Sequence, residues 1–169
     1  KITFLNNDLE IEYKKDKLSV VGEGKILLQE NDDKIFYKLE KIKKNLKFTS
    51  TIKINDNPLN IDLLNYSRNE NALIDIKGTK KDNGIFLNLF SLKEKDNIFN
   101  INDLELNQKK QIKKIGKINL DYFDNNNQNN SISLVQKDKK YILKGSYFNA
   151  DNFLKNILDN KDENSSILR

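Results

Sequence analysis

The chain has 169 residues, of which 30 are Lys or Arg and 25 are Asp or Glu, so its formal net charge is +5. It contains no Cys and no His, which excludes disulfides, thiolate metal sites and histidine-based catalysis. No apolar run reaches the roughly 20 residues that a membrane-spanning helix needs, and because Met is absent we expect the chain to be a segment of a longer protein.

Alternation of apolar and polar residues predicts β-strands along most of the chain. In LKFTSTIKI (46–54), Leu, Phe and Ile share one parity, whereas Lys and Thr occupy the other. Such a pattern is typical of a strand with one buried and one solvated face. The expected strands span residues 2–5, 8–14, 17–29, 34–42, 45–55, 58–64, 71–80, 84–93, 97–107, 111–124, 131–138 and 140–148.

Clusters of turn-forming residues separate the expected strands. They are ENDDK (30–34), NDNP (55–58), KDNG (81–84), KEKDN (93–97) and DNNNQNN (124–130). The pair Asn83-Gly84 is the strongest hairpin signal, because both residue types tolerate a positive φ. Short connections of this kind predict antiparallel neighbours throughout.

A helical pattern is expected only after residue 148. Asn149 can cap the first turn of a helix, and Phe148 and Phe153 occupy the positions of a hydrophobic staple across that cap. The apolar face of the helix would comprise Phe153, Leu154, Ile157 and Leu158. We therefore predict a single β-rich domain over residues 1–160, followed by a linker or cut end at 161–169.

A sheet of about a dozen amphipathic strands has one apolar face that must be covered, and one short helix is too small to cover it. The sheet can fold into a sandwich, close into a barrel or curl into an open trough. Periodicity alone leaves these three architectures open. All three are mainly β, and the first and third differ in whether the apolar face is a packed core or an accessible groove.

No catalytic or metal-binding constellation is evident, so the sequence predicts a protein that is not an enzyme and needs no cofactor or metal. Lys residues are mixed with Asp and Glu along every segment, which argues against a nucleic-acid partner. Two segments, 41–47 and 109–117, are rich in Lys. They are either solvated strand faces that block edge aggregation or surfaces that attract anionic lipid headgroups.

Residues 71–158 carry a resemblance to a known family. The pieces are ALIDIKGTKKDNGIFLNLFSL, FNINDLELN, IGKINLDYF and SISLVQKDKKYILKGSYFNADNFLKNIL. This order resembles the central region of YhdP-like proteins in the AsmA-like superfamily. Gly145 matches the family's glycine, Asn149 stands where Asp is usual, and Phe153 and Leu154 match the apolar pair that follows.

The resemblance implies a long curled antiparallel sheet, a repeating β-groove closed here by a short C-terminal helix, with a β-sandwich as the alternative. It implies non-enzymatic phospholipid transport between the inner and outer membranes in support of outer-membrane integrity. The protein would be periplasmic and tethered to the inner membrane through segments outside this chain.

In that reading, phospholipid acyl chains are the partners of the apolar face. The residues expected to contact them are Leu46, Phe48, Ile52, Ile54, Ile118, Leu120 and Tyr122. Two other functions remain open. One is a β-sandwich interaction or adhesion module of the cell surface, and the other is a soluble periplasmic carrier of lipoprotein or lipopolysaccharide.

Overall fold

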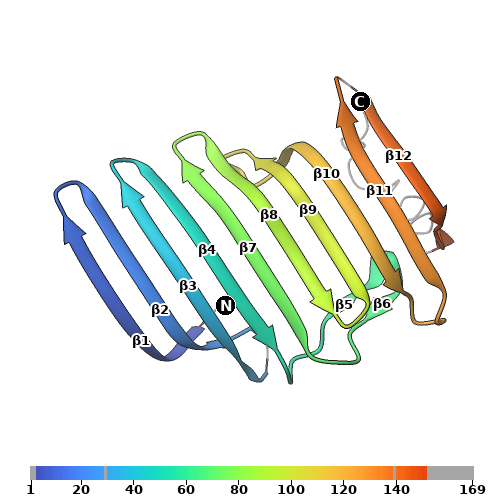
Figure 1. Cartoon of the computed structure of the whole chain (residues 1–169), viewed down its shortest axis with the longest axis horizontal. Coiled ribbons are helices and arrows are strands. Elements are labelled where there is room, and N and C mark those ends of the chain that lie inside the picture. Colours follow the sequence, from blue (N-terminus) through green and yellow to red (C-terminus); the bar gives the residue numbers. More distant parts are fainter. Residues whose placement is uncertain (1–2, 29, 139, 152–169) are drawn as a thin grey trace.

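The computed structural model describes residues 3–28, 30–138 and 140–151, and within them the chain forms one open antiparallel sheet of ten strands (Figure 1). The strand order is β1-β2-β3-β4-β7-β8-β9-β10-β11-β12, so every strand pairs with the strands before and after it in this order. Strands β1 and β12 are the two edges of the sheet. The sequence-based prediction of a long antiparallel sheet is confirmed.

The ten strands of the large sheet are each 8 to 12 residues long. Their bounds are β1 (Thr3–Lys14), β2 (Lys17–Leu27), β3 (Asp32–Ile42), β4 (Asn45–Ile54), β7 (Ala72–Lys81), β8 (Gly84–Glu94), β9 (Asn97–Leu106), β10 (Ile112–Phe123), β11 (Asn129–Lys137) and β12 (Lys140–Tyr147). A small two-stranded sheet, β5 (Asn60–Ile61) and β6 (Tyr66–Ser67), flanks the short 3₁₀ helix η1 (Asp62–Leu64).

Three of the expected strands differ from the structure. As far as they are described, the segments expected at 2–5 and 8–14 form a single strand, β1, whose register against β2 shifts between Leu5 and Asp8, where Asn6 has a φ of 47°. The segment 58–64 is not a strand but contains β5 and η1, which ends at Asn65 with a φ of 49°. Pro58 lacks the backbone N–H that a paired strand would need at this position.

Alternate residues of each strand point to opposite faces of the sheet, and cross-strand partners share a face. We call the face that bears Ile35, Ile52, Ile74 and Leu92 the apolar face, because these residues are consecutive partners across β3, β4, β7 and β8. The opposite face, which we call the polar face, carries hydroxyl, amide and charged side chains. Thr51 on this face donates a hydrogen bond of 2.6 Å to Asp75 on the next strand.

The turns β1–β2, β3–β4, β7–β8, β9–β10 and β11–β12 lie at one end of the strands, which we call the hairpin end, whereas the turns β2–β3, β8–β9 and β10–β11 lie at the other. At the opposite end, residues 55–71 connect β4 to β7 and cross the apolar face. We call residues 55–71 the strap, and the end that they cover the strap end. Tyr66 of the strap is 1% exposed and packs against Phe99 and Tyr122 of the sheet, with ring centroids 4.7 and 6.1 Å away.

The hydrophobic core lies under the strap. Its buried residues are Ile26, Ile35, Ile52, Ile54, Tyr66, Ala72, Ile74, Leu92, Phe99 and Tyr122. All of these except Tyr66 belong to the half of the sheet at the strap end. The strap therefore acts as the local second layer that the sheet needs to bury part of its apolar face.

The described chain ends where the C-terminal helix is expected. Asp151 is helical, and its backbone N–H donates to the Asn149 side-chain oxygen at 3.1 Å, as expected for an N-terminal cap. Phe153, Leu154, Ile157 and Leu158 lie outside the described residues. Among the residues that are described, no helix is long and apolar enough to cross a membrane.

Candidate functional site

The hairpin half of the apolar face carries a row of apolar residues across eight strands. Consecutive cross-strand partners in this row are Ile11, Val20, Leu39, Phe48, Gly78, Leu87, Leu104 and Ile115. We call this set the apolar row. Its side chains are exposed at Ile11 and half-buried elsewhere, since no described segment covers them as the strap covers the core.

Gly78 interrupts the apolar row without interrupting its surface. A Cβ at position 78 would lie 2.7 Å from Cζ of Phe48 and 2.6 Å from the carbonyl oxygen of Phe86. The Phe48 ring therefore occupies the space above Gly78. Glycine allows the aromatic ring to lie flat along the sheet, which keeps the row continuous from β4 to β8.

A second apolar row lies between the apolar row and the core and reaches all ten strands. Its consecutive partners are Leu9, Gly22, Tyr37, Ser50, Ile76, Phe90, Ile101, Ile118, Leu134 and Leu143. Gly22 again makes room for an aromatic ring, because a Cβ there would lie 2.4 Å from Cζ of Tyr37. The uncovered part of the apolar face is therefore at least two side chains wide, measured along the strands from the hairpin end toward the core.

Two lysines stand on the apolar face at its hairpin end. Lys41 and Lys80 are cross-strand partners of Leu46 on either side, and Lys80 is also the partner of Ile85. Both lysines are exposed, and neither forms an ion pair with another described residue. The apolar face is thus bordered by unpaired ammonium groups at its open end.

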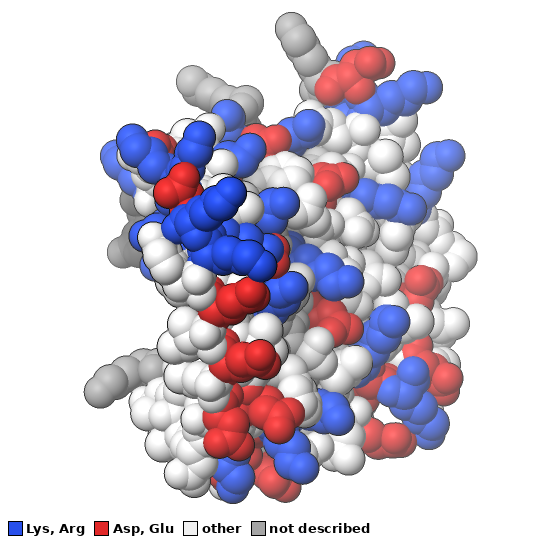
Figure 2. All heavy atoms as spheres, turned by 60° about the vertical axis from the view of Figure 1, so that its left-hand side comes forward, with Lys and Arg blue, Asp and Glu red and all other residues white. Residues whose placement is uncertain are grey.

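The turns beyond this border are also basic, and Figure 2 shows basic side chains gathered toward the upper end of the molecule, above acidic ones. The described lysines of the hairpin end are Lys14, Lys15, Lys17, Lys41, Lys43, Lys44, Lys80, Lys81, Lys109, Lys110, Lys113, Lys114, Lys137 and Lys140. Only a few acidic groups accompany them, such as Asp82, which lies 3.5 Å from Lys44. The two Lys-rich segments of the sequence, 41–47 and 109–117, therefore lie at the same end of the sheet.

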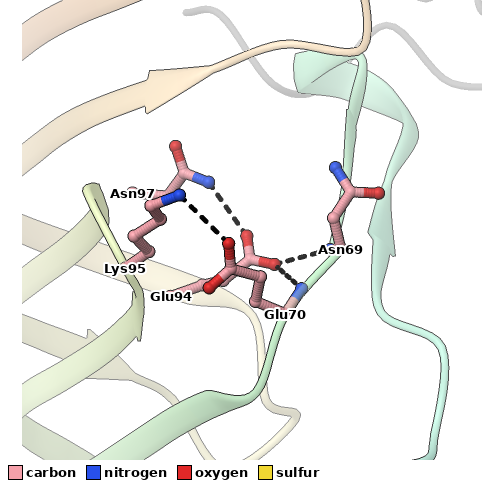
Figure 3. A network of polar contacts seen from close by, with 5 residues as sticks. All are labelled: Asn69, Glu70, Glu94, Lys95 and Asn97. Carbon is pink, nitrogen blue, oxygen red and sulfur yellow. Dashed lines mark hydrogen bonds and ion pairs between the residues drawn. The ribbon is translucent and has the colours of Figure 1, made fainter.

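The strap end has a different character, because three of its acidic groups, Asp33, Glu94 and Asp124, are buried, and Figure 3 shows the contacts of Glu94. Glu94 at the end of β8 is 2% exposed. It accepts hydrogen bonds from the Tyr66 hydroxyl at 2.6 Å, from the backbone N–H groups of Asn69 and Glu70 at 2.5 Å each, and from the Asn97 amide at 2.9 Å. One carboxylate thus joins the strap to β8 and β9.

A second buried carboxylate holds the beginning of the strap. Asp33 on β3 is 1% exposed and accepts hydrogen bonds from the Asn55 backbone N–H at 2.9 Å and the Asn57 amide at 2.7 Å. The middle of the strap is held by β10 and by the turn that follows it. There Tyr122 donates to the carbonyl oxygen of Leu64 at 3.1 Å, and the Asn125 backbone N–H donates to the Asn65 carbonyl at 2.8 Å.

These contacts shift the pKa values of the buried groups. Burial alone raises the pKa of Glu94, but the hydrogen bonds from Tyr66, the strap backbone and Asn97 outweigh it, so its pKa lies below the usual 4.5. Burial, together with the hydrogen bond to Glu94, raises the pKa of Tyr66. Burial, with the nearby charge of Asp124, raises the pKa of Tyr122 to about 12. Around neutral pH, Glu94 is therefore ionised, and Tyr66 and Tyr122 are neutral.

The seven residues predicted to contact acyl chains all lie on the apolar face, but they occupy two different environments. Ile52, Ile54 and Tyr122 are buried beneath the strap and belong to the core. The sequence pattern does not predict the strap, and for this reason it placed these three residues on an open surface. Leu46, Phe48, Ile118 and Leu120 are half-buried. Of these, Phe48 belongs to the apolar row, and Leu46 lies beside it at the border formed by Lys41 and Lys80.

The residues of the predicted C-terminal motif that are described make specific local contacts. A Cβ at Gly145 would lie 2.6 Å from the carbonyl oxygen of Ser131, so the close approach of β11 requires glycine there. The Asn149 backbone N–H donates to the buried side chain of Asn130 at 2.8 Å, and its amide donates to Asp124 at 3.3 Å. Phe148 is half-buried, and Phe153 and Leu154 lie outside the described residues.

A hollow of about 550 Å³ lies elsewhere on the described chain. Most of its lining side chains belong to the polar face of β1 to β7, including Glu10, Glu23, Phe36 and Lys38, and none of the seven predicted residues contributes to it. The mixed charges of this hollow suit no single ligand. No group of three or more Asp or Glu residues within the described chain could hold a metal ion.

Fold and surface together define a class: an open, one-sided antiparallel sheet with an uncovered apolar half and a basic end. Comparison of the chain with protein-family models, with curated proteins and with solved structures finds no match in any of the three. The resemblance to the AsmA-like superfamily therefore stays a prediction. The functional argument depends on the geometry of the apolar face.

Sequence reasoning missed the strap, its buried carboxylates Asp33 and Glu94, and the two lysines of the apolar face. Lys41 and Lys80 could have been found, because each shares the parity of the apolar residues in its strand. Asp33 and Glu94 lie beside turn clusters, where a carboxylate is ordinarily solvated. No pattern in the sequence distinguishes them from exposed turn residues.

Proposed function

We propose that this chain binds the acyl chains of anionic phospholipids along the apolar row, as one segment of a lipid conduit between the inner and outer membranes of a bacterial envelope. The observation that carries the proposal is the uncovered apolar row itself. Seven apolar side chains and one glycine follow one another across eight strands, on a sheet that buries its other apolar residues under a dedicated strap.

The dimensions of the row suit an acyl chain. Neighbouring strands are about 4.8 Å apart, so seven intervals span about 34 Å. The acyl chains of one leaflet extend over about half of the roughly 30 Å hydrocarbon core of a bilayer. The row can therefore accommodate a whole acyl chain with length to spare. Transfer of apolar surface from water to such a row is favourable by about 25 cal/mol per Å².

The border of the row supports an anionic headgroup. An acyl chain on the apolar row leaves its headgroup within reach of the hairpin end, where Lys41 and Lys80 are unpaired. Lys residues near an anionic lipid surface contribute about 1 kcal/mol each. The basic turns around them extend the same attraction to the surface of a membrane. The arrangement of the apolar row and the two lysines thus matches a lipid that has an apolar chain and an anionic headgroup.

The strap restricts the proposed site to the hairpin half of the apolar face. Ile52, Ile54 and Tyr122 are in contact with the strap and not with solvent, so an acyl chain would lie across the strands on the hairpin half of the sheet. Movement of lipid would then follow the strand-to-strand direction, from β1 toward β12 or the reverse. Residue-specific contacts should therefore be confined to the hairpin half.

Photo-crosslinking at neighbouring residues of β4 tests the proposal. A photoreactive phenylalanine analogue is introduced at Phe48, on the apolar row, or at Thr49, which follows directly and points to the polar face. Each variant is incubated with vesicles of phosphatidylethanolamine and phosphatidylglycerol, irradiated and examined by mass spectrometry. We expect lipid adducts at position 48 and none at position 49. Equal labelling at both positions, or none at either, would contradict the proposal.

A second experiment tests the headgroup. Lys41→Glu combined with Lys80→Glu should lower phosphatidylglycerol crosslinking at position 48 and leave phosphatidylethanolamine crosslinking nearly unchanged. Lys34→Glu combined with Lys53→Glu, on the polar face of β3 and β4, is the control. Mass spectrometry of lipid extracted from natively purified protein then distinguishes phospholipid from lipopolysaccharide or an acylated protein. Protein that carries no lipid at all favours an interaction module.

A further inference from the structure

The two edge strands of the sheet are complementary to each other. Among the described residues, β1 on one side and β12 on the other each pair with a single neighbour, so each has one row of backbone N–H and C=O groups without a strand partner there. Neither strand contains Pro. Free edges of this length are templates for pairing with another strand. Their side chains show which strand would fit.

On the apolar face, both edges expose large hydrophobic side chains. β1 presents Leu9, Ile11 and Tyr13, which are 55%, 62% and 75% exposed. β12 presents Tyr141 and Leu143, the latter 64% exposed. Within β1 and β12 as described, no charged residue lies on this face, although an inward-pointing charge is the usual means of preventing edge association.

On the polar face, the edges carry opposite charges. β1 presents Asp8, Glu10 and Glu12, whereas β12 presents Lys140 and Lys144. None of these five side chains forms an ion pair with another described residue. An unpaired acidic row at one edge and unpaired lysines at the other favour contact between unlike edges and oppose contact between like edges.

The number of strands makes such a contact geometrically possible. Because ten strands alternate in direction, β12 runs antiparallel to β1. A second copy placed beside the first in the same orientation therefore brings its β1 antiparallel to β12, with both apolar faces on the same side. We propose that β12 of one molecule pairs with β1 of a second copy of this chain, extending the sheet head to tail.

Charge and face together select one register. Shifts by an odd number of residues place apolar side chains on the polar face and are excluded. Of the remaining registers, one forms two ion pairs and brings apolar residues together on the other face. Its cross-strand pairs are Glu12 with Lys140, Ile11 with Tyr141, Glu10 with Ile142, Leu9 with Leu143 and Asp8 with Lys144. A shift by two residues in either direction leaves a single ion pair.

The proposal does not depend on what the apolar row binds. A heterologous contact of this kind leaves one free edge at each end, so it produces dimers and longer rows as concentration rises. Each added copy would extend the apolar face by another ten strands. The contact has the chemistry of strand addition, with main-chain hydrogen bonds supplying affinity and side chains supplying specificity.

Single cysteines test the register, because the chain has no Cys of its own. Glu10→Cys and Ile142→Cys are directly opposite in the proposed pairing. An equimolar mixture of the two variants, oxidised at high concentration, should give a disulfide-linked heterodimer. Phe36→Cys, on the polar face in the middle of the sheet and 39% exposed, is the control partner for Glu10→Cys and should give no dimer.

Charge reversal tests the specificity. Asp8→Lys with Glu12→Lys, or Lys140→Glu with Lys144→Glu, should each weaken self-association about tenfold or more in sedimentation velocity runs, since like charges then face each other. Mixing the two variants should restore association, because every edge then meets an opposite charge. All of these substitutions are at exposed positions, so folding is checked simply by circular dichroism.

Three outcomes would overturn the proposal. Wild-type chain that stays monomeric up to millimolar concentration lacks the contact. Glu10→Cys that crosslinks with itself as well as with Ile142→Cys indicates a symmetric β1–β1 dimer. Association that persists after charge reversal but disappears with detergent indicates contact through the apolar faces and not through the edges.

Discussion

The hairpin end and the strap end of this sheet are built from the same strands but bury the apolar face to different extents. At the strap end, Leu92 is 1% exposed, and polar partners surround two buried carboxylates. At the hairpin end, Leu87 of the same strand and the same face is half-buried, and the nearest ionic groups are unpaired lysines. One strand thus passes from a packed core to an uncovered surface within five residues.

This difference separates the contacts that stabilise the fold from the site of the proposed function. The strap end contains the contacts that require a unique fold, because Glu94 and Asp33 are buried and depend on specific donors. The hairpin end contains apolar side chains that the protein does not use for its own core. Substitutions at the strap end should therefore affect unfolding, and substitutions at the hairpin end should affect ligand contact.

The largest expected effect comes from one leucine at each end of β8. Leu92→Ala removes a fully buried side chain from the core and should lower the free energy of unfolding by about 3 to 4 kcal/mol. Leu87→Ala, the matched control, should lower it by about 1 kcal/mol, because its surroundings are open to solvent. Urea unfolding followed by circular dichroism measures both. Equal losses would show that the hairpin end is as well packed as the core.

The next effect concerns the carboxylate that fastens the strap. Glu94→Ala leaves the Tyr66 hydroxyl, two backbone N–H groups and the Asn97 amide without their acceptor. We expect a loss of about 3 kcal/mol, since buried donors without partners are costly. Glu12→Ala, an exposed glutamate without an ion pair, should change stability by less than about 0.5 kcal/mol. The same urea titration compares them, and a loss below about 1 kcal/mol for Glu94→Ala would contradict the network.

Acid should weaken the strap end selectively. The pKa of Glu94 is lower in the folded chain than its unfolded value of 4.5, so its stabilising contribution is complete above pH 4.5 and is lost as pH falls through the folded value. Glu94→Gln should reduce the loss of stability below pH 4.5. Thermal unfolding of both proteins between pH 3 and pH 7 measures this, and parallel pH profiles would exclude Glu94 as a contributor.

The smallest effect concerns a single hydroxyl. Tyr122→Phe removes the hydrogen bond to the carbonyl oxygen of Leu64 but keeps the ring that packs against Tyr66 and Phe99. Stability should fall by about 1 kcal/mol. Absorbance at alkaline pH should also lose one tyrosine that titrates at about 12. Tyr13→Phe, at a 75% exposed position, should leave stability unchanged.

Much of the sheet could be predicted from the sequence, because alternation fixes which residues share a face. The registry of Leu39 and Phe48 follows from parity once the hairpins are placed. Parity fails in β8, where a register shift against β7 beyond Lys77 places Leu87 on the same face as Leu92. Several hairpins also lack the usual Gly or Asn signal, and their turns place Lys15, Lys43 and Lys95 at a φ of 53°, 53° and 48°. There, strand length and not turn chemistry indicates where the chain reverses.

The strap could not be predicted, for a physical reason. Its position over the sheet depends on partners far away in the chain, such as the contact of Tyr66 with Glu94 and that of Leu64 with Tyr122. Local pattern does not record such distances. This is why Ile52, Ile54 and Tyr122 were expected at an open groove, although their parity was correct, and are instead buried.

The order of the strands has a consequence for how this molecule is made. Since each of the ten strands pairs only with strands adjacent in the order of the chain, almost every pairing closes a short loop, and only the strap requires a longer one. Folding can therefore begin at any hairpin and grow outward one strand at a time, as in other architectures with nearest-neighbour contacts. During synthesis, each strand of the large sheet after β1 can therefore pair with the preceding strand as soon as it emerges.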